Sequence, residues 1–111
     1  MEQPLVSIII PTYKRPDTLD RAINSVLNQT YKNIEVIVVD DNNPETEGRR
    51  LTESKMAPFA ENPRVRYIKH EKNKNGSAAR NTGARASKGE FIGFLDDDDQ
   101  FLPKKIESQV A

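Results

Sequence analysis

The chain has 111 residues, no cysteine, and 17 basic and 17 acidic side chains, so its formal net charge is zero. This length supports one domain with a modest core, and the lack of cysteine excludes disulfides and thiolate metal sites. The charge balance argues against nucleic acid or an anionic membrane surface as the main partner. Because the apolar runs are too short for a membrane span or a signal peptide, we expect a cytoplasmic domain, or the cytoplasmic face of a longer membrane protein.

Two apolar, β-branched runs in the first half are typical of strands that are buried on both faces, as in a parallel sheet. They cover residues 5–10 and 34–39. We expect Pro11 to end the first strand, because proline cannot donate to a ladder. Between the runs, apolar side chains recur at helical spacing after Pro16, which suits the first position of a helix. This helix is expected to end within residues 28–33.

The middle of the chain carries weaker signals. Residues 44–60 are polar with a few large apolar side chains, and they predict a helix that ends at Pro58 or Pro63. Residues 65–68 alternate between apolar and polar side chains. That alternation predicts a third, half-exposed strand near an edge of the sheet.

The last third predicts a helix, a strand and a second helix. Residues 76–87 form a helix whose small side chains share one face, which allows a close approach to the sheet: Ala79, Gly83 and Ala86. Residues 91–95 are apolar and predict a short buried strand. Pro103 can open the final helix.

Strands and helices therefore alternate, which predicts an α/β fold with a Rossmann-like parallel sheet of about four strands flanked by helices. Ligands of such sheets bind where the strand order reverses, outside the carboxyl ends of the strands. If the order is 3-2-1-4, that point lies between the first and fourth strands. Three strand ends carry unusual residues, namely 11–13, 40–41 and 96–99.

Four consecutive carboxylates, 96–99, follow the fourth strand. They repel one another, and oxygen ligands suit hard divalent cations such as Mg²⁺, Mn²⁺ or Ca²⁺. In an extended segment Asp96 and Asp98 project to the same side, and a diphosphate could complete the shell of a metal ion held there. A solvated acidic loop is the alternative.

Other candidate side chains also allow two interpretations. Tyr13 could stack on a base or simply cover the surface. Asp41 could accept a hydrogen bond from an imide such as that of uracil, or it could cap the following helix together with Asp40. Arg15 and Arg80 could pair with phosphate oxygens or remain solvated.

Several other motifs are missing from the sequence. It contains neither a G-x-G-x-x-G nor a Walker-type phosphate loop. Residues 11–16 lack the glycines that a sugar nucleotidyltransferase would be expected to show. His70, the only histidine, is more typical of a loop residue than of a metal ligand.

Five blocks, in this order, resemble the start of a family 2 glycosyltransferase of the GT-A fold: 6–13, 25–31, 35–41, 75–83 and 89–99, followed by Pro103. The resemblance covers nearly the whole chain. It implies a nucleotide-sugar donor, often linked to UDP, a divalent Mn²⁺ or Mg²⁺ ion, and inverting transfer.

The resemblance also implies roles for single residues. Nucleotide-binding roles fall on Pro11, Thr12, Tyr13, Arg15, Asp41, Arg80, Asp96 and Asp97. Within that set, Asp41 would contact the base, and Asp96 and Asp97 would lie near the ribose and diphosphate. Asp98 would be the best metal ligand, with Asp96 as the second ligand. The middle residue of this Asp-x-Asp motif is often small in the family and is Asp97 here, which leaves the assignment among the neighbouring carboxylates open.

Members of this family are longer than 111 residues, and their second half supplies the acceptor site and the general base. We therefore expect residues 1–111 to form the nucleotide-sugar-binding half alone, with the catalytic base beyond Ala111. Such a domain would bind donor weakly, transfer no sugar and self-associate through an unpaired edge of the fourth strand or through the final helix. A non-catalytic nucleotide- or cation-binding module is the alternative, and neither the sugar nor the acceptor is identified.

Overall fold

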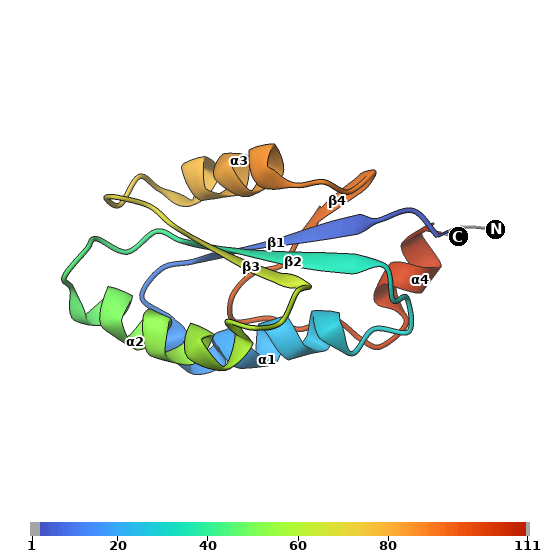
Figure 1. Cartoon of the computed structure of the whole chain (residues 1–111), viewed down its shortest axis with the longest axis horizontal. Coiled ribbons are helices and arrows are strands. Elements are labelled where there is room, and N and C mark those ends of the chain that lie inside the picture. Colours follow the sequence, from blue (N-terminus) through green and yellow to red (C-terminus); the bar gives the residue numbers. More distant parts are fainter. Residues whose placement is uncertain (1–2, 111) are drawn as a thin grey trace.

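In the computed structural model, which describes residues 3–110, four parallel strands form one sheet in the order β3-β2-β1-β4 (Figure 1). The strands are β1 (Val6–Thr12), β2 (Ile34–Asp40), β3 (Val65–Lys69) and β4 (Phe91–Phe94). This confirms the α/β class and the strand order expected from the sequence. β3 is an edge strand with partly buried side chains, as its alternating pattern predicts.

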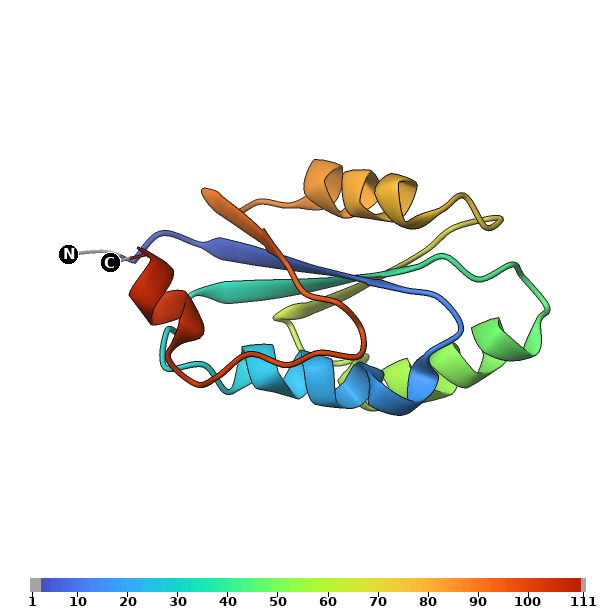
Figure 2. The same ribbon diagram turned by 180° about the vertical axis from the view of Figure 1, so that it is seen from behind.

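Helices cover both faces of the sheet (Figures 1 and 2). α3 (Gly76–Ala86) lies alone on one face, whereas α1 (Pro16–Leu27) and α2 (Glu47–Met56) lie on the other. A short 3₁₀ helix (Ala57–Phe59) continues α2, and α4 (Lys105–Val110) packs beside β1 and β4 on the α1 side. None of the described helices combines the length and apolar character that crossing a membrane requires.

Side chains of the two central strands alternate between two hydrophobic layers. Ile8, Ile10 and Val36 belong to the larger layer, which packs against α1. Ile9 and Ile37 belong to the smaller layer under α3. Because both faces are covered, most positions of β1 and β2 are apolar, and this explains the β-branched runs in the sequence.

Pro11 does not end β1, contrary to expectation, because the strand continues to Thr12 and pairs with β2 throughout. The carbonyl of Ile9 accepts from Leu95 on the β4 side, and that of Thr12 accepts from Asp41 on the β2 side. The backbone N–H and C=O groups of successive residues in a strand face alternate neighbouring strands. Pro11, two residues after Ile9, therefore has its nitrogen on the β4 side. Pairing with β4 already ends at Ile9, so the ladder loses no hydrogen bond there.

β4 is less buried than its apolar sequence suggests. Phe91, Ile92 and Phe94 are each close to half exposed. In the described part of the chain, β4 pairs with β1 on one side only, and the other side is an open edge. The expectation of a buried strand was therefore wrong for β4. An apolar sequence indicates a buried strand only where the strand has a neighbouring strand on each side.

Small residues bring α3 unusually close to the sheet. A Cβ atom built on Gly83 would lie 2.4 Å from Cγ2 of Ile9, closer than real contacts allow. Ala79, on the same face of α3, is completely buried. The sequence prediction of a close helix–sheet contact is confirmed, and it fixes the height of α3 above the ends of the strands.

A buried carboxylate, that of Glu35, connects several elements at the end of the sheet where β1 and β2 begin. Glu35 accepts hydrogen bonds from the Ser7 hydroxyl (2.6 Å) and the Lys88 amide (2.7 Å), and it pairs with Arg66. Burial alone would raise the pKa of Glu35, but these three donors together hold that pKa below its usual value. The connection between α3 and β4 is thereby tied to β1 and β2.

We predict that Gly83→Ala destabilises the fold by about 1–3 kcal/mol, because the clash with Ile9 outweighs the better helix propensity of alanine. Chemical denaturation would measure the change. Gly76→Ala is the matched control, since the added methyl group would meet only the Arg80 side chain, at 3.5 Å. Equal stabilities for the two variants would contradict the close packing of α3.

Candidate functional site

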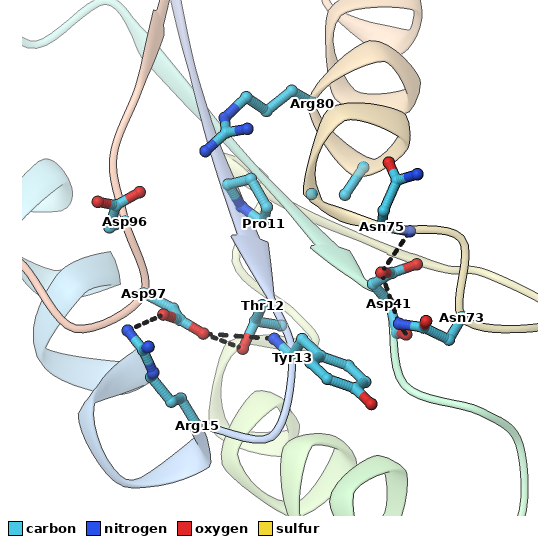
Figure 3. A pocket seen from close by; sticks show the side chains of 12 residues that line it. Pro11, Thr12, Tyr13, Arg15, Asp41, Asn73, Asn75, Arg80, Asp96 and Asp97 are labelled. Carbon is cyan, nitrogen blue, oxygen red and sulfur yellow. Dashed lines mark hydrogen bonds and ion pairs between the residues drawn. The ribbon is translucent and has the colours of Figure 1, made fainter.

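The carboxyl edge of the sheet holds a pocket of about 480 Å³ (Figure 3). It lies between the ends of β1 and β2, the first turn of α3 and the segment after β4. Its lining is Pro11, Thr12, Tyr13, Arg15, Asp41, Asn73, Asn75, Gly76, Ala79, Arg80, Asp96 and Asp97. The structure thus brings together all eight residues that the resemblance marks for nucleotide binding, and it leaves Asp98 outside the lining.

Asp97 ties the end of β1 to the segment after β4. Its buried carboxylate accepts from the Thr12 hydroxyl at 2.9 Å and more weakly from the Tyr13 amide at 3.4 Å. The Thr18 hydroxyl, in the first turn of α1, donates to the Asp97 carbonyl at 2.7 Å. Burial raises the pKa of Asp97, although the Thr12 and Tyr13 donors and Arg15 oppose that rise. Asp97 therefore holds two strand ends together at the pocket wall.

Asp96 and Asp98 have different surroundings. Asp96 is exposed and lines the pocket, where Figure 3 shows its carboxylate across from Arg80. Asp98 instead forms an ion pair with Arg15, with 2.7 Å between Oδ2 and Nη1. Arg15 also approaches Asp97, at 3.6 Å. The guanidinium thus offsets part of the repulsion within the acidic run.

The donor set fits a divalent ion only in part. Within residues 3–110, no three His, Cys, Asp or Glu side chains are arranged to hold a metal ion. Mg²⁺ and Mn²⁺ commonly use one or two protein carboxylates and take further oxygens from phosphate and water. Asp96 meets that requirement, whereas Asp98 would first have to release Arg15.

Asp41 has its carboxylate fully occupied by protein donors. Oδ1 accepts from the Lys74 amide at 2.9 Å and lies 2.8 Å from Nδ1 of His70. Oδ2 accepts from the Asn73 side chain at 2.9 Å and from the Asn75 amide at 3.0 Å. Four donors match the four lone-pair sites of an ionised carboxylate. Asp41 therefore organises residues 73–75 as part of the pocket wall.

Asp40 belongs to a separate buried cluster beneath the pocket. Its carboxylate lies 3.1 Å from Nε of Arg49 and accepts from Tyr67 and Asn42. Burial and the neighbouring Asp40 charge raise the pKa of Tyr67 far above its usual value, so this phenol stays protonated. The cap of α2 is Thr46, whose hydroxyl accepts from the Arg49 amide. The structure thus excludes helix capping as the role of either Asp40 or Asp41.

Tyr13 and Arg80 flank the opening of the pocket from opposite sides. Tyr13 is 42% exposed, and the ammonium of Lys14 lies 5.1 Å from its ring centroid. Arg80 extends from α3 over Pro11, with its guanidinium directed into the pocket (Figure 3). An aromatic face and a cation near carboxylates suit a ligand that carries both a flat ring and a charged group.

Three residues that shape this region were missed from the sequence. Asn73 and Asn75 line the pocket, and His70, which lies in the loop after β3 as expected, is buried beside Asp41. All three follow β3, so they reach the same edge of the sheet as the other strand ends. Their position after a parallel strand could have marked them as pocket residues. They were missed because the sequence predicted β3 as a strand near the edge of the sheet, away from the site.

The sequence profile of Glycosyl transferase family 2 matches residues 7–111. A similar curated protein is the UDP-Glc:alpha-D-GlcNAc-diphosphoundecaprenol beta-1,3-glucosyltransferase WfgD of Escherichia coli. It is 38% identical over the whole of this chain. The chain spans 42% of the length of that relative.

Two solved structures share the fold. S. aureus TarS in complex with UDP-GlcNAc superposes with a TM-score of 0.77 and 25% identity, covering 95% of this chain and 30% of that one. The mannosyltransferase PcManGT from Pyrobaculum calidifontis, in complex with GDP-Man and Mn²⁺, gives a TM-score of 0.76 and 26% identity. That match covers 90% of this chain and 29% of the mannosyltransferase.

We predict that Asp41→Asn lowers the free energy of unfolding by about 1–3 kcal/mol, because the new amide group would face donors and leave at least one unpaired. Asp98→Asn is the control. It removes an exposed ion pair and should change stability by no more than about 0.5 kcal/mol. Denaturant titration at neutral pH would measure both, and an unchanged Asp41→Asn variant would contradict the four-donor arrangement.

Proposed function

Since this chain belongs to Glycosyl transferase family 2, we propose that it binds a nucleoside diphosphate sugar as the donor-binding domain of an inverting glycosyltransferase. One observation carries this proposal. The eight residues implied by the resemblance come from three strand ends and from α3, and they line a single pocket. An unrelated surface would have no reason to gather them.

The chemistry of the lining matches the parts of such a donor. In the proposed complex, the ring of Tyr13 stacks on the nucleobase, and Arg80 pairs with diphosphate oxygens. Because Asp41 is already saturated with donors, its contact with the base would require the exchange of one internal hydrogen bond. UDP is the proposed nucleotide, supported by the UDP-sugar named for the glucosyltransferase and by the UDP-GlcNAc complex.

We propose Mn²⁺ or Mg²⁺ as the cofactor, held by Asp96 and Asp98, and the relative that binds Mn²⁺ supports this. Such an ion, when bound, neutralises the charge that develops on the departing diphosphate. Asp96 already lines the pocket. Arg15, which is 57% exposed, can exchange Asp98 for a phosphate oxygen at little cost, because exposed ion pairs are weak.

The acceptor site and the general base of the reaction are proposed to lie outside these 111 residues. The longer relatives, of which the chain covers less than half, are consistent with this division. Alone, the domain would bind donor weakly and transfer no sugar. A module that binds nucleotide without catalysis is then the accurate description of the isolated chain.

We predict metal-dependent binding of UDP. Calorimetric titration of UDP should show binding in the presence of Mn²⁺ and much weaker binding without it. Asp98→Ala and Asp96→Ala should each abolish the metal-dependent part, whereas Asp99→Ala, outside the pocket lining, should retain it. Binding that is indifferent to Mn²⁺ would exclude the proposed metal site, and the absence of any UDP binding would exclude the donor pocket.

We also predict self-association through β4. Its outer edge is open in the described part of the chain, and its apolar side chains border a cavity of about 410 Å³ beside α4. An unpaired, apolar edge favours pairing with a second copy. Light scattering should show dimers or larger species at high concentration, and Ile92→Lys should shift them to monomer. A wild-type chain that stays monomeric would refute this part.

A further inference from the structure

His70 is a buried side chain for which the proposed function has no role so far. It is 6% exposed and follows β3 directly. Its backbone is fixed at both polar groups, because the amide donates to the Asp40 carbonyl and the carbonyl accepts from Arg49. The backbone of His70 is therefore held beside the end of β2.

The ring of His70 connects β2 with α3. Nδ1 lies 2.8 Å from Oδ1 of Asp41, and Nε2 lies 2.8 Å from Oγ1 of Thr82. An ionised carboxylate can only accept, so Nδ1 carries the proton and donates it. Nε2 of a neutral ring then accepts from the Thr82 hydroxyl. The contacts thus select one tautomer, with hydrogen on Nδ1.

The Asp41 carboxylate that contacts His70 also holds residues 73–75 in place through hydrogen bonds. The same carboxylate receives the amides of Lys74 and Asn75 and the side chain of Asn73. Asn75 has a φ of 134°, which is unfavourable for a residue with a side chain, and its own side chain caps α3 by accepting from Ala78. A strained segment of this kind keeps its shape only while its hydrogen bonds hold.

We propose that His70 is a positioning residue of the nucleotide pocket. It acts by orienting Asp41, which holds residues 73–75 and the first turn of α3 against the bound nucleotide. This role rests on the proposed donor binding for its functional effect, but the structural link can be measured without any ligand. His70 itself is not part of the pocket lining.

Two variants distinguish the contribution of Nδ1 of His70 from that of Nε2. His70→Asn keeps an N–H donor close to the place of Nδ1, and His70→Gln places its amide near Nε2 and loses the donor to Asp41. Hydrogen exchange of the Lys74 and Asn75 amides reports the link directly. We expect exchange about tenfold faster in His70→Gln and close to wild type in His70→Asn.

UDP affinity in the presence of Mn²⁺ should follow the same order, with a loss of about tenfold for His70→Gln and recovery in His70→Asn. Equal behaviour of the two variants, or a change in melting temperature alone, would overturn the proposal. If no form of the chain binds UDP, the donor pocket fails while the exchange data still decide the role of His70.

Because the chain has a single histidine, nitrogen NMR of labelled protein can identify the tautomer without mutation. A proton on Nδ1 of the neutral ring is expected, and one on Nε2 would contradict the proposal. Should His70→Gln fail to fold, Thr82→Val tests the same link. It removes the partner of Nε2 while keeping the side-chain shape, so exchange at Lys74 and Asn75 should rise about threefold, and unchanged exchange would count against it.

Discussion

Parallel pairing of all four strands is the constraint on which the pocket depends. Strands that run in one direction must all end at one edge, so side chains far apart in the sequence meet there. Asp41 and Asp96 come together for this reason. The order β3-β2-β1-β4 places the first and last strands side by side, with α3 above them and α1 below. The pocket is therefore a result of topology, and its chemistry depends on which residues occupy the strand ends.

Aspartates at this edge fall into two groups according to burial. Asp40, Asp41 and Asp97 are buried, and each is surrounded by donors that belong to the protein. Burying a carboxylate without such partners would be prohibitive, so these three serve as fixed joints between strands. Asp96 and Asp98 are exposed to solvent, and Asp98 pairs with the exposed side chain of Arg15. The second group is therefore less tightly held by protein donors than the first.

Much of the fold could be predicted from the sequence, since the periodic and β-branched runs depend on local chemistry and on burial on two faces. The close approach of α3 was also visible, in the spacing of Ala79 and Gly83. The exposure of β4 and the burial of His70 were not, because both depend on which elements become neighbours. The separation of Asp97 from Asp98 was equally hidden, since four identical side chains in a row carry no sign of which one turns inward.

The place of Pro11 has a consequence for the shape of the sheet. Its nitrogen faces the side on which the chain leaves β4, and this nitrogen has no hydrogen to offer. The end of β1 and the segment after β4 therefore cannot continue their backbone hydrogen bonds beyond Leu95. A residue with an ordinary amide would place one more hydrogen-bond donor on this side of β1. Beyond Leu95, the two segments are joined instead by the Asp97 side chain, which accepts from Thr12 and Tyr13 at the pocket wall.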